Sequence, residues 1–169
     1  MHPEREEKSM IRKMRRFKQQ LSDEAAVELM EKTSWGTLAV VGDDGYPYAV
    51  PLSQVWLNGR IYFHGASQGH KFDALLQNPK VSFSVVGQDE VVPEKLTMLY
   101  TSAIAFGTAR LVEDEDEKRA ALVAFADKFG ASNGLEKNLE EIERVWKIVR
   151  VFAIDVELMT GKASMELKS

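Results

Sequence analysis

The sequence predicts a mainly β fold, a small antiparallel barrel with helices at its ends. Several apolar stretches alternate with a period of two, as strands with one buried face do. Short turns rich in Gly, Asp and Asn join most of these stretches, so neighbouring strands are expected to run antiparallel. Helical patterns separate the strands at only a few places, which disfavours a parallel α/β sheet.

The chain is expected to begin its fold with a helix and a hairpin. Ser22 can cap a helix that has acidic residues in its first turn, where they complement the helix dipole. The run WGTLAVV at 35–41 is typical of a strand, and GDDG is a turn in which Gly45 can take a positive φ. The partner strand over 46–56 contains two prolines, which predict an edge position or an interruption.

The middle of the chain continues with strands and one short helix. RIYFHG at 60–65 predicts a strand, and HKFDALLQ at 70–77 predicts a helix that ends before Asn78-Pro79. KVSFSVV at 80–86 is an alternating strand, and 87–97 is expected to be a loop.

A long strand is expected over 98–112. Small residues alternate along one of its faces, which would let another sheet, a helix or a flat ligand approach closely; they are Ala103, Ala105, Gly107 and Ala109. A helix capped by Asp114 and ended by Gly130 follows, with an apolar stripe that includes Phe125 and Phe129. A short helix over 138–146 and a last strand from 147 bring the total to about six strands.

Composition limits the class of protein. The chain has 169 residues, 44% of them hydrophobic and 28% charged, which fits one globular domain. We expect this domain to span 21–169, after a basic arm at 1–20 that is either solvated or crosses onto a partner subunit or an anionic ligand. The net charge of −4 argues against a nucleic-acid partner.

The sequence lacks several features that mark other classes. It has no cysteine, which excludes disulfides and thiol catalysis and fits the cytoplasm. No apolar run is long enough for a membrane span, and the N-terminus does not resemble a signal peptide. Hydrolysis by Ser67 is disfavoured because no nucleophile elbow surrounds it. We expect no structural metal site, although a single histidine would suffice for haem.

The stretch FHGASQGHK, at 63–71, carries the clearest chemical signal. Gly65 and Gly69 let backbone N–H groups approach an anion, and the helix that follows adds the positive end of its dipole. Lys71 adds a full positive charge. These features indicate a phosphate site, and the competing interpretation is a glycine-rich loop with a surface histidine.

Several segments together resemble one family. They are MRRFKQQLS, WGTLAVVGDDGYPYAVPLSQVW, GRIYFHGASQGHKFDALLQNPKVSFSVVG, SAIAFGTARLVEDEDEKRAAL and MTGKAS. In this order they resemble the flavin-binding split-barrel proteins related to pyridoxamine 5′-phosphate oxidase, and most of all the branch of 5-nitroimidazole resistance proteins. The resemblance implies a six-stranded antiparallel split β-barrel, a homodimer, and one FMN in each groove between the subunits.

The resemblance also implies roles for individual residues. The isoalloxazine ring would lie along Val50, Pro51, Leu52 and Ser53, and the ribityl chain along His64, Gly65 and Ala66. Ser67, His70 and Lys71 would hold the phosphate. His70 is also the candidate catalytic residue facing a small substrate. Ser102, with the small-residue face after it, would come from the other subunit.

Two classes of function remain open at this point. The first is a flavin-dependent oxidoreductase that reduces a small electrophile such as a nitroaromatic, with a nicotinamide cofactor as electron donor. The second is a flavin carrier, a sensor or a haem-handling relative without rapid turnover. FAD remains an alternative to FMN.

Overall fold

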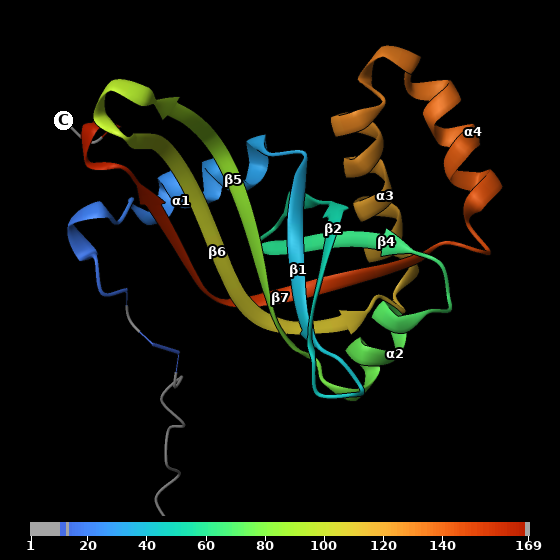
Figure 1. The fold of residues 1–169 in the computed structure, drawn as a ribbon. Coiled ribbons are helices and arrows are strands. Elements are labelled where there is room, and N and C mark those ends of the chain that lie inside the picture. Colours follow the sequence, from blue (N-terminus) through green and yellow to red (C-terminus); the bar gives the residue numbers. More distant parts are fainter. Residues whose placement is uncertain (1–10, 13, 168–169) are drawn as a thin grey trace, which may run out of the picture.

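The computed structural model describes residues 11–12 and 14–167. In this part of the chain, seven strands form one curled antiparallel sheet, and four α-helices pack around it (Figure 1). The strands are β1 (Trp35–Val41), β2 (Pro47–Ser53), β3 (Val55–Leu57), β4 (Arg60–Gly65), β5 (Lys80–Val92), β6 (Thr97–Leu111) and β7 (Arg150–Ala163). The helices are α1 (Asp23–Lys32), α2 (His70–Gln77), α3 (Glu115–Phe129) and α4 (Leu135–Val145). The fold is the mainly β, antiparallel split barrel with flanking helices that the sequence predicts.

The sheet has one more strand than the six predicted. Its order is β2-β1-β5-β6-β7-β4-β3, so β2 and β3 lie at opposite edges although they follow one another in the chain. Gln54, between them, is fully buried, and its amide donates to the carbonyls of Met30 at 2.7 Å and Thr33 at 2.9 Å. The chain crosses from one edge to the other at this residue, which divides the single strand expected over 46–56.

The inner face of the curled sheet holds the main core. Phe63, Phe83 and Phe152 are fully buried there, and α1 and α2 close over the same core through Met30 and Leu75. Full burial of such a side chain stabilises the fold by about 1.5–3 kcal/mol. This core fixes the direction of β4 and the start of α2, which carry the candidate site.

The small-residue face of β6 also points into this core. Ala103 and Ala105 have no exposed surface, and both α1 and α2 contact β6. A Cβ atom on Gly107 would stand 2.3 Å from the carbonyl oxygen of Asp155 on β7. The sequence left open whether a sheet, a helix or a flat ligand would cover this face. In the structure, helices of the same chain cover it. The expectation that a second subunit would offer it to a flavin is therefore corrected.

One half of the sheet's outer face is covered by the helical hairpin α3–α4. Val55, Tyr62 and Val151 of the sheet pack there against Phe125 and Ile142 of the helices, forming a second core. The ribbon shows the hairpin standing at one end of the sheet (Figure 1).

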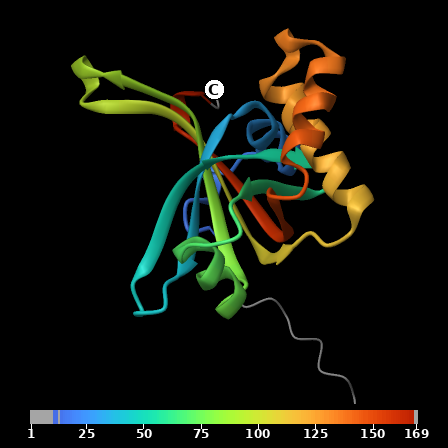
Figure 2. The same cartoon turned by 90° about the vertical axis from the view of Figure 1, so that its right-hand side faces the viewer.

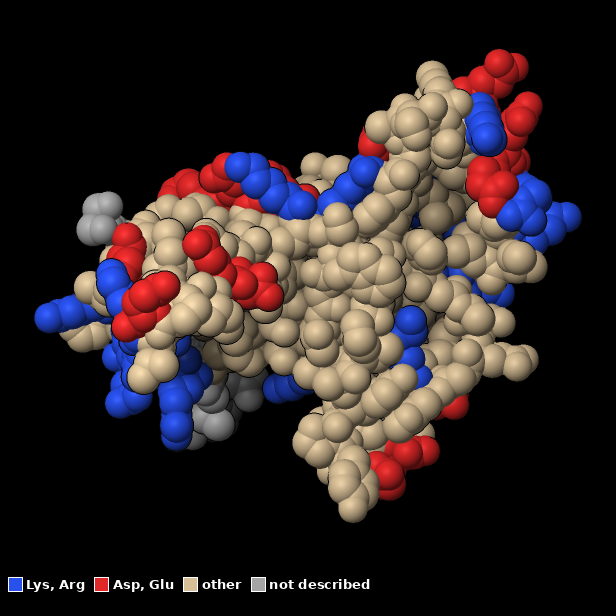
Figure 3. Space-filling model, turned by 45° about the horizontal axis from the view of Figure 1, so that its top comes forward, with Lys and Arg blue, Asp and Glu red and all other residues tan. Residues whose placement is uncertain are grey.

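The other half of the outer face, over β2, β1, β5 and the middle of β6, is not covered by any described helix. We call it the bare half. It carries Trp35, which is 63% exposed, together with the exposed apolar side chains of Val86 and Ile104. Figure 3 shows a tan area over the middle of the molecule, with most Lys, Arg, Asp and Glu side chains around its edges and a few blue ones at its right-hand side.

Strands β5 and β6 extend beyond the sheet as a two-stranded ribbon (Figure 2). The sequence predicted a loop at 87–97, but pairing continues from Gln88↔Thr101 to Val92↔Thr97, and only the short turn at 93–96 is not strand. No residue of the ribbon is fully buried, so its sequence lacks the apolar alternation from which a strand is predicted.

The remaining local predictions concern the termini of the helices and the arm. Ser22 accepts a hydrogen bond from the backbone N–H of Ala25, and Asp114 accepts one from Glu117, as expected of caps. Residues 1–10 and 13 of the basic arm lie outside the described residues; Phe17–Gln19 forms a 3-10 turn, and Gln20 pairs with Lys162 on β7. None of the described helices is long and apolar enough to cross a bilayer.

Candidate functional site

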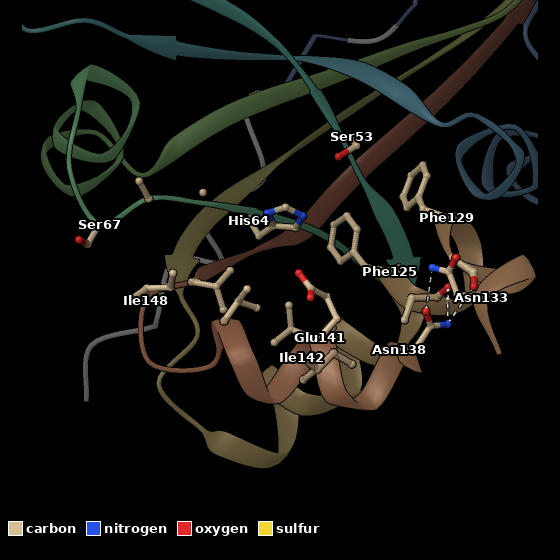
Figure 4. Close-up of a pocket in the computed structure, with 17 residues that line it drawn as sticks. Ser53, His64, Ser67, Phe125, Phe129, Asn133, Asn138, Glu141, Ile142 and Ile148 are labelled. Atoms are coloured by element: carbon tan, nitrogen blue, oxygen red, sulfur yellow. Dashed lines mark hydrogen bonds between the residues drawn. The ribbon is translucent and has the colours of Figure 1, made fainter. Parts of the chain in front are cut away.

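A cleft of ≈ 860 Å³ lies between the end of β4 and the hairpin α3–α4 (Figure 4). Its strand-side wall is formed by five residues that the sequence assigns to the cofactor, namely Ser53, His64, Gly65, Ala66 and Ser67. The volume falls in the range of about 300–1,000 Å³ typical of small-molecule sites. The structure therefore brings Ser53, at the end of β2, onto the same wall as residues 64–67, up to fourteen positions later in the chain.

His64 is the one titratable group on this wall. It follows Phe63 on β4, and because strand side chains alternate, it points away from the main core toward α3. Its ring meets Phe125 edge to face at 4.7 Å between centroids. Desolvation by the cleft walls lowers the pKa of His64, and the positive charge of Lys71 lowers it further. Both effects favour the neutral form of the imidazole over the charged form.

The loop between β4 and α2 places Lys71 next to Gly65 of the cleft wall, although Lys71 does not itself line the cleft. Gly69 has φ +119°, which a residue with a side chain rarely adopts, and it begins α2 without a side-chain cap. Lys71, in the first turn, reaches back so that its Nζ would be 3.2 Å from a Cβ on Gly65. Burial lowers the pKa of Lys71. None of the ion pairs among the described residues involves this amine.

His70 points elsewhere. Successive residues of a helix project about 100° apart, so His70 and Lys71 leave α2 in different directions. The His70 ring stacks on Tyr48 at 4.3 Å, and its Nε2 lies 3.5 Å from a carboxylate oxygen of Asp43 in the β1–β2 turn. His70 does not line the cleft, so the structure separates it from His64.

The predicted ring contacts lie on both faces of β2. Leu52 is buried in the main core and Val50 packs against it, so their side chains point inward. Pro51 is exposed and Ser53 lines the cleft. Ser102 lies on β6 opposite Val86 and Lys162, on the bare half and outside the cleft.

Comparison with known proteins decides the family. The family model described as pyridoxamine 5′-phosphate oxidase matches residues 22–163. The chain belongs to the pyridoxamine 5′-phosphate oxidase family. No curated protein sequence gives a significant match.

Solved structures share the fold of this family member. A candidate 5-nitroimidazole antibiotic resistance protein from Bacteroides thetaiotaomicron has a TM-score of 0.73 and 22% identity, covering 85% of this chain and 86% of that chain. A FAD and heme binding protein from Mycobacterium smegmatis has a TM-score of 0.69 and 24% identity, covering 86% of this chain and 73% of that one. A flavocytochrome from Azotobacter vinelandii has a TM-score of 0.71 and 20% identity, covering 90% of this chain and 72% of that one.

The wall opposite β4 was not predicted from the sequence of this pyridoxamine 5′-phosphate oxidase family member. It comes from α3, α4 and the turn after them, and includes Phe125, Phe129, Asn138 and Glu141. The sequence places Phe125 and Phe129 on one apolar stripe of α3. In the structure Phe125 is buried in the second core, whereas Phe129 is 46% exposed.

No group of three or more His, Asp or Glu side chains that could hold a metal ion occurs among the described residues. The cleft of this family member offers an imidazole, two hydroxyls, a carboxylate, two amides and an apolar wall, with an ammonium nearby. Such a set can bind and orient an organic group.

We expect Lys71→Met to raise the pKa of His64 while leaving it below its ordinary value. The substitution removes the charge of Lys71 but keeps the desolvation, which is the larger cause of the lowered pKa. The measurement is the pH titration of the His64 ring signal by NMR, assigned with His64→Gln. A pKa that stays unchanged or falls in Lys71→Met would contradict the proximity of the two groups.

Proposed function

We propose that this protein binds a flavin in the candidate site and acts as a homodimeric oxidoreductase toward a small electrophile such as a nitroaromatic. The observation that carries the proposal is the amine of Lys71, which makes no ion pair among the described residues and lies over the Phe63 ring at 5.7 Å. It stands at the uncapped first turn of α2, next to Gly65 of the cleft wall. Family membership and the descriptions of the structural neighbours as flavin and FAD proteins support it.

A phosphate fits the residues at this edge. The first backbone N–H groups of α2 have no side-chain acceptor, and a helix N-terminus favours an anion. A Cβ on Gly69 would meet nothing within 4 Å, so the backbone can be approached closely. Lys71 would supply the balancing charge, and Ser67 a hydroxyl from the same loop. We assign the phosphate end of FMN to this group and keep FAD as the alternative.

The ring would lie where the cleft opens onto the bare half. Pro51 and Ser53 present their side chains there, while Val50 and Leu52 offer only backbone. An uncovered apolar surface of this kind typically marks an interface. We propose that a second copy of the chain covers it and brings its Ser102 toward the flavin.

The residues of the site would bind and orient rather than react. A bound flavin supplies transfer of electrons or hydride, with a nicotinamide cofactor as the proposed donor. His64 is neutral and can accept or donate one hydrogen bond at the polar edge of a ligand. His70, held against Tyr48, stays a prediction as a contact for the phosphate or the substrate.

We expect the wild-type protein to quench added FMN at one flavin per chain, and Lys71→Ala to weaken this binding at least tenfold. A hydrogen bond to a charged group contributes about 1.5 kcal/mol at the lower end of its range, which corresponds to this factor. The measurement is fluorescence titration with FMN, FAD and riboflavin. Riboflavin lacks the phosphate, so its affinity should be the same in wild type and Lys71→Ala.

Lys95→Ala, which removes an exposed lysine in the β5–β6 turn, is the matched control and should leave all three affinities unchanged. Failure of the wild type to bind any of the three flavins would refute the proposed function. If Lys71→Ala lost as much affinity for riboflavin as for FMN, Lys71 would not be the group that binds the phosphate. An oxidoreductase also requires that a nitro compound reoxidise the reduced, bound flavin faster than free flavin; equal rates would indicate a carrier.

A further inference from the structure

The hairpin wall of the cleft has a chemical character of its own. Phe125 and Phe129 stack at 5.9 Å on α3, and Val145 and Ile148 face the same space from the end of α4 and the turn after it. Phe129 is 46% exposed and Ile148 is 69% exposed although each is large and apolar. A folded chain rarely leaves contiguous apolar side chains on a concave surface unless something binds there.

The polar groups of this wall are already engaged within the hairpin. The Asn138 amide donates to the carbonyl of Gly130 at 3.0 Å, and the Asn133 amide donates to Asn138 Oδ1 at 3.2 Å, as the dashed lines of Figure 4 show. These bonds hold the turn between α3 and α4. The Asn138 amide also donates to the carbonyl of Ala126 at 3.4 Å, so both of its N–H groups are engaged. Asn133 keeps one N–H that bonds to none of the described residues.

A carboxylate completes the hairpin side. Glu141 points from α4 into the cleft (Figure 4) and is paired with Arg144, whose hydrogen bond lowers the pKa of Glu141. Arg144 itself does not line the cleft. A ligand at this wall therefore meets aromatic rings, branched aliphatic groups and a carboxylate. The positive charge of Lys71 is next to Gly65 of the opposite wall and does not line the cleft.

We infer that the hairpin half of the cleft binds a neutral, largely apolar ring compound and discriminates against its anionic counterpart. The apolar walls supply burial, and Phe125 and Phe129 supply aromatic contacts. His64, on the opposite wall of the cleft, can bond one polar edge of the ring. The inference rests on the proposed function and defines the substrate class of that site, and it names a subsite distinct from that of the flavin phosphate.

The test uses two probes that differ only in charge. N-phenyl-1-naphthylamine is neutral, and 8-anilino-1-naphthalenesulfonate is the same ring system with a sulfonate. Both gain fluorescence in an apolar site. We expect the neutral probe to bind the wild-type protein at least tenfold more tightly, and to bind equally well when the protein is saturated with FMN.

Four variants test where the neutral probe binds and why the charged one does not. Phe129→Ala and Ile148→Ser change exposed side chains of the cleft. Each should weaken the binding of the neutral probe at least threefold. Leu135→Ala changes a residue on α4 that is 68% exposed but outside the cleft, and should have no effect. Glu141→Gln should reduce the ratio of the two probes' dissociation constants at least threefold, because it removes the negative charge from the wall.

FMN titration of the same samples separates the two proposals. If FMN binds and the neutral probe does not, or if both probes bind alike, the inference is wrong and the proposed function stands. If FMN displaces the neutral probe, the hairpin half of the cleft is part of the flavin-binding site, which also overturns the inference. If the probe binds as expected but FMN does not, the cleft is a site for apolar rings and the proposed function fails.

Discussion

Gly107→Val is expected to destabilise the protein by about 3 kcal/mol or more, the upper end of what overpacking costs in a close-packed core. A Cβ at position 107 would stand 2.3 Å from the carbonyl oxygen of Asp155 and 3.0 Å from its carbonyl carbon. Both atoms belong to the backbone of β7, so relief requires that β6 and β7 separate. The pairing of these two strands already shifts register between Phe106 and Gly107.

The measurement is unfolding in urea, or the thermal midpoint, which should fall by roughly 6–12 °C for a chain of this size. Thr108→Val is the control, because it adds the same side chain at the next position, on the outer face, and removes one exposed hydrogen bond to Glu157. We expect its effect to remain below about 1 kcal/mol. A Gly107→Val protein as stable as the control would show that the two strands do not approach as closely as the structure indicates.

The elements that the sequence predicts well are those decided by nearby residues. The caps at Ser22 and Asp114 bond to N–H groups three residues away, and the end of α2 follows from the proline after Asn78. The division of the strand at Gln54 could not be predicted in this way. Gln54 is held by carbonyls of α1 more than twenty residues earlier, and a buried glutamine within an apolar run has no periodic signature.

The two walls of the candidate site also differ in whether nearby residues in the sequence could predict them. The loop 65–71 was predicted because glycine, lysine and a helix start are adjacent in the chain, and the structure keeps them together. The opposite wall comes from 122–149, more than fifty residues later. Its side chains have the pattern of an ordinary amphipathic helix, so only the three-dimensional arrangement shows that Phe129 faces a cleft rather than a core.

A network of charged groups ties the sheet to the start of α3. Arg110 on β6 donates to Asp155 at 2.8 Å and to both oxygens of Glu117 at 3.0 and 2.7 Å. Arg60 donates to the other oxygen of Asp155, and the Tyr62 hydroxyl donates to Glu117 at 2.8 Å. Hydrogen bonds from Arg110 lower the pKa of Glu117. Burial alone would raise the pKa of Asp155, but the bonds from Arg110 and Arg60 outweigh it and lower the value.

We therefore expect Arg110→Met to cost about 2–3 kcal/mol at neutral pH. Breaking a buried pair costs about 3–5 kcal/mol, and solvent reduces the effect here because the groups are partly exposed. Lys32→Met removes an exposed pair with Glu28 and should cost less than about 0.5 kcal/mol. The measurement is the free energy of unfolding in urea for the wild type and both variants.

We also expect the stability difference between wild type and Arg110→Met to depend on pH. The sign of this dependence follows from the lowered pKa values of the two carboxyl groups. In the folded state, Asp155 and Glu117 bind fewer protons than in the unfolded chain at mildly acidic pH. Their contribution is complete above the unfolded pKa values, near 4, and is lost as pH falls through the lower folded values. The difference between wild type and Arg110→Met should thus shrink from pH 7 to pH 3, whereas that for Lys32→Met stays small throughout. A difference that is constant over this range would mean that Arg110 stabilises the fold by packing rather than by its charge.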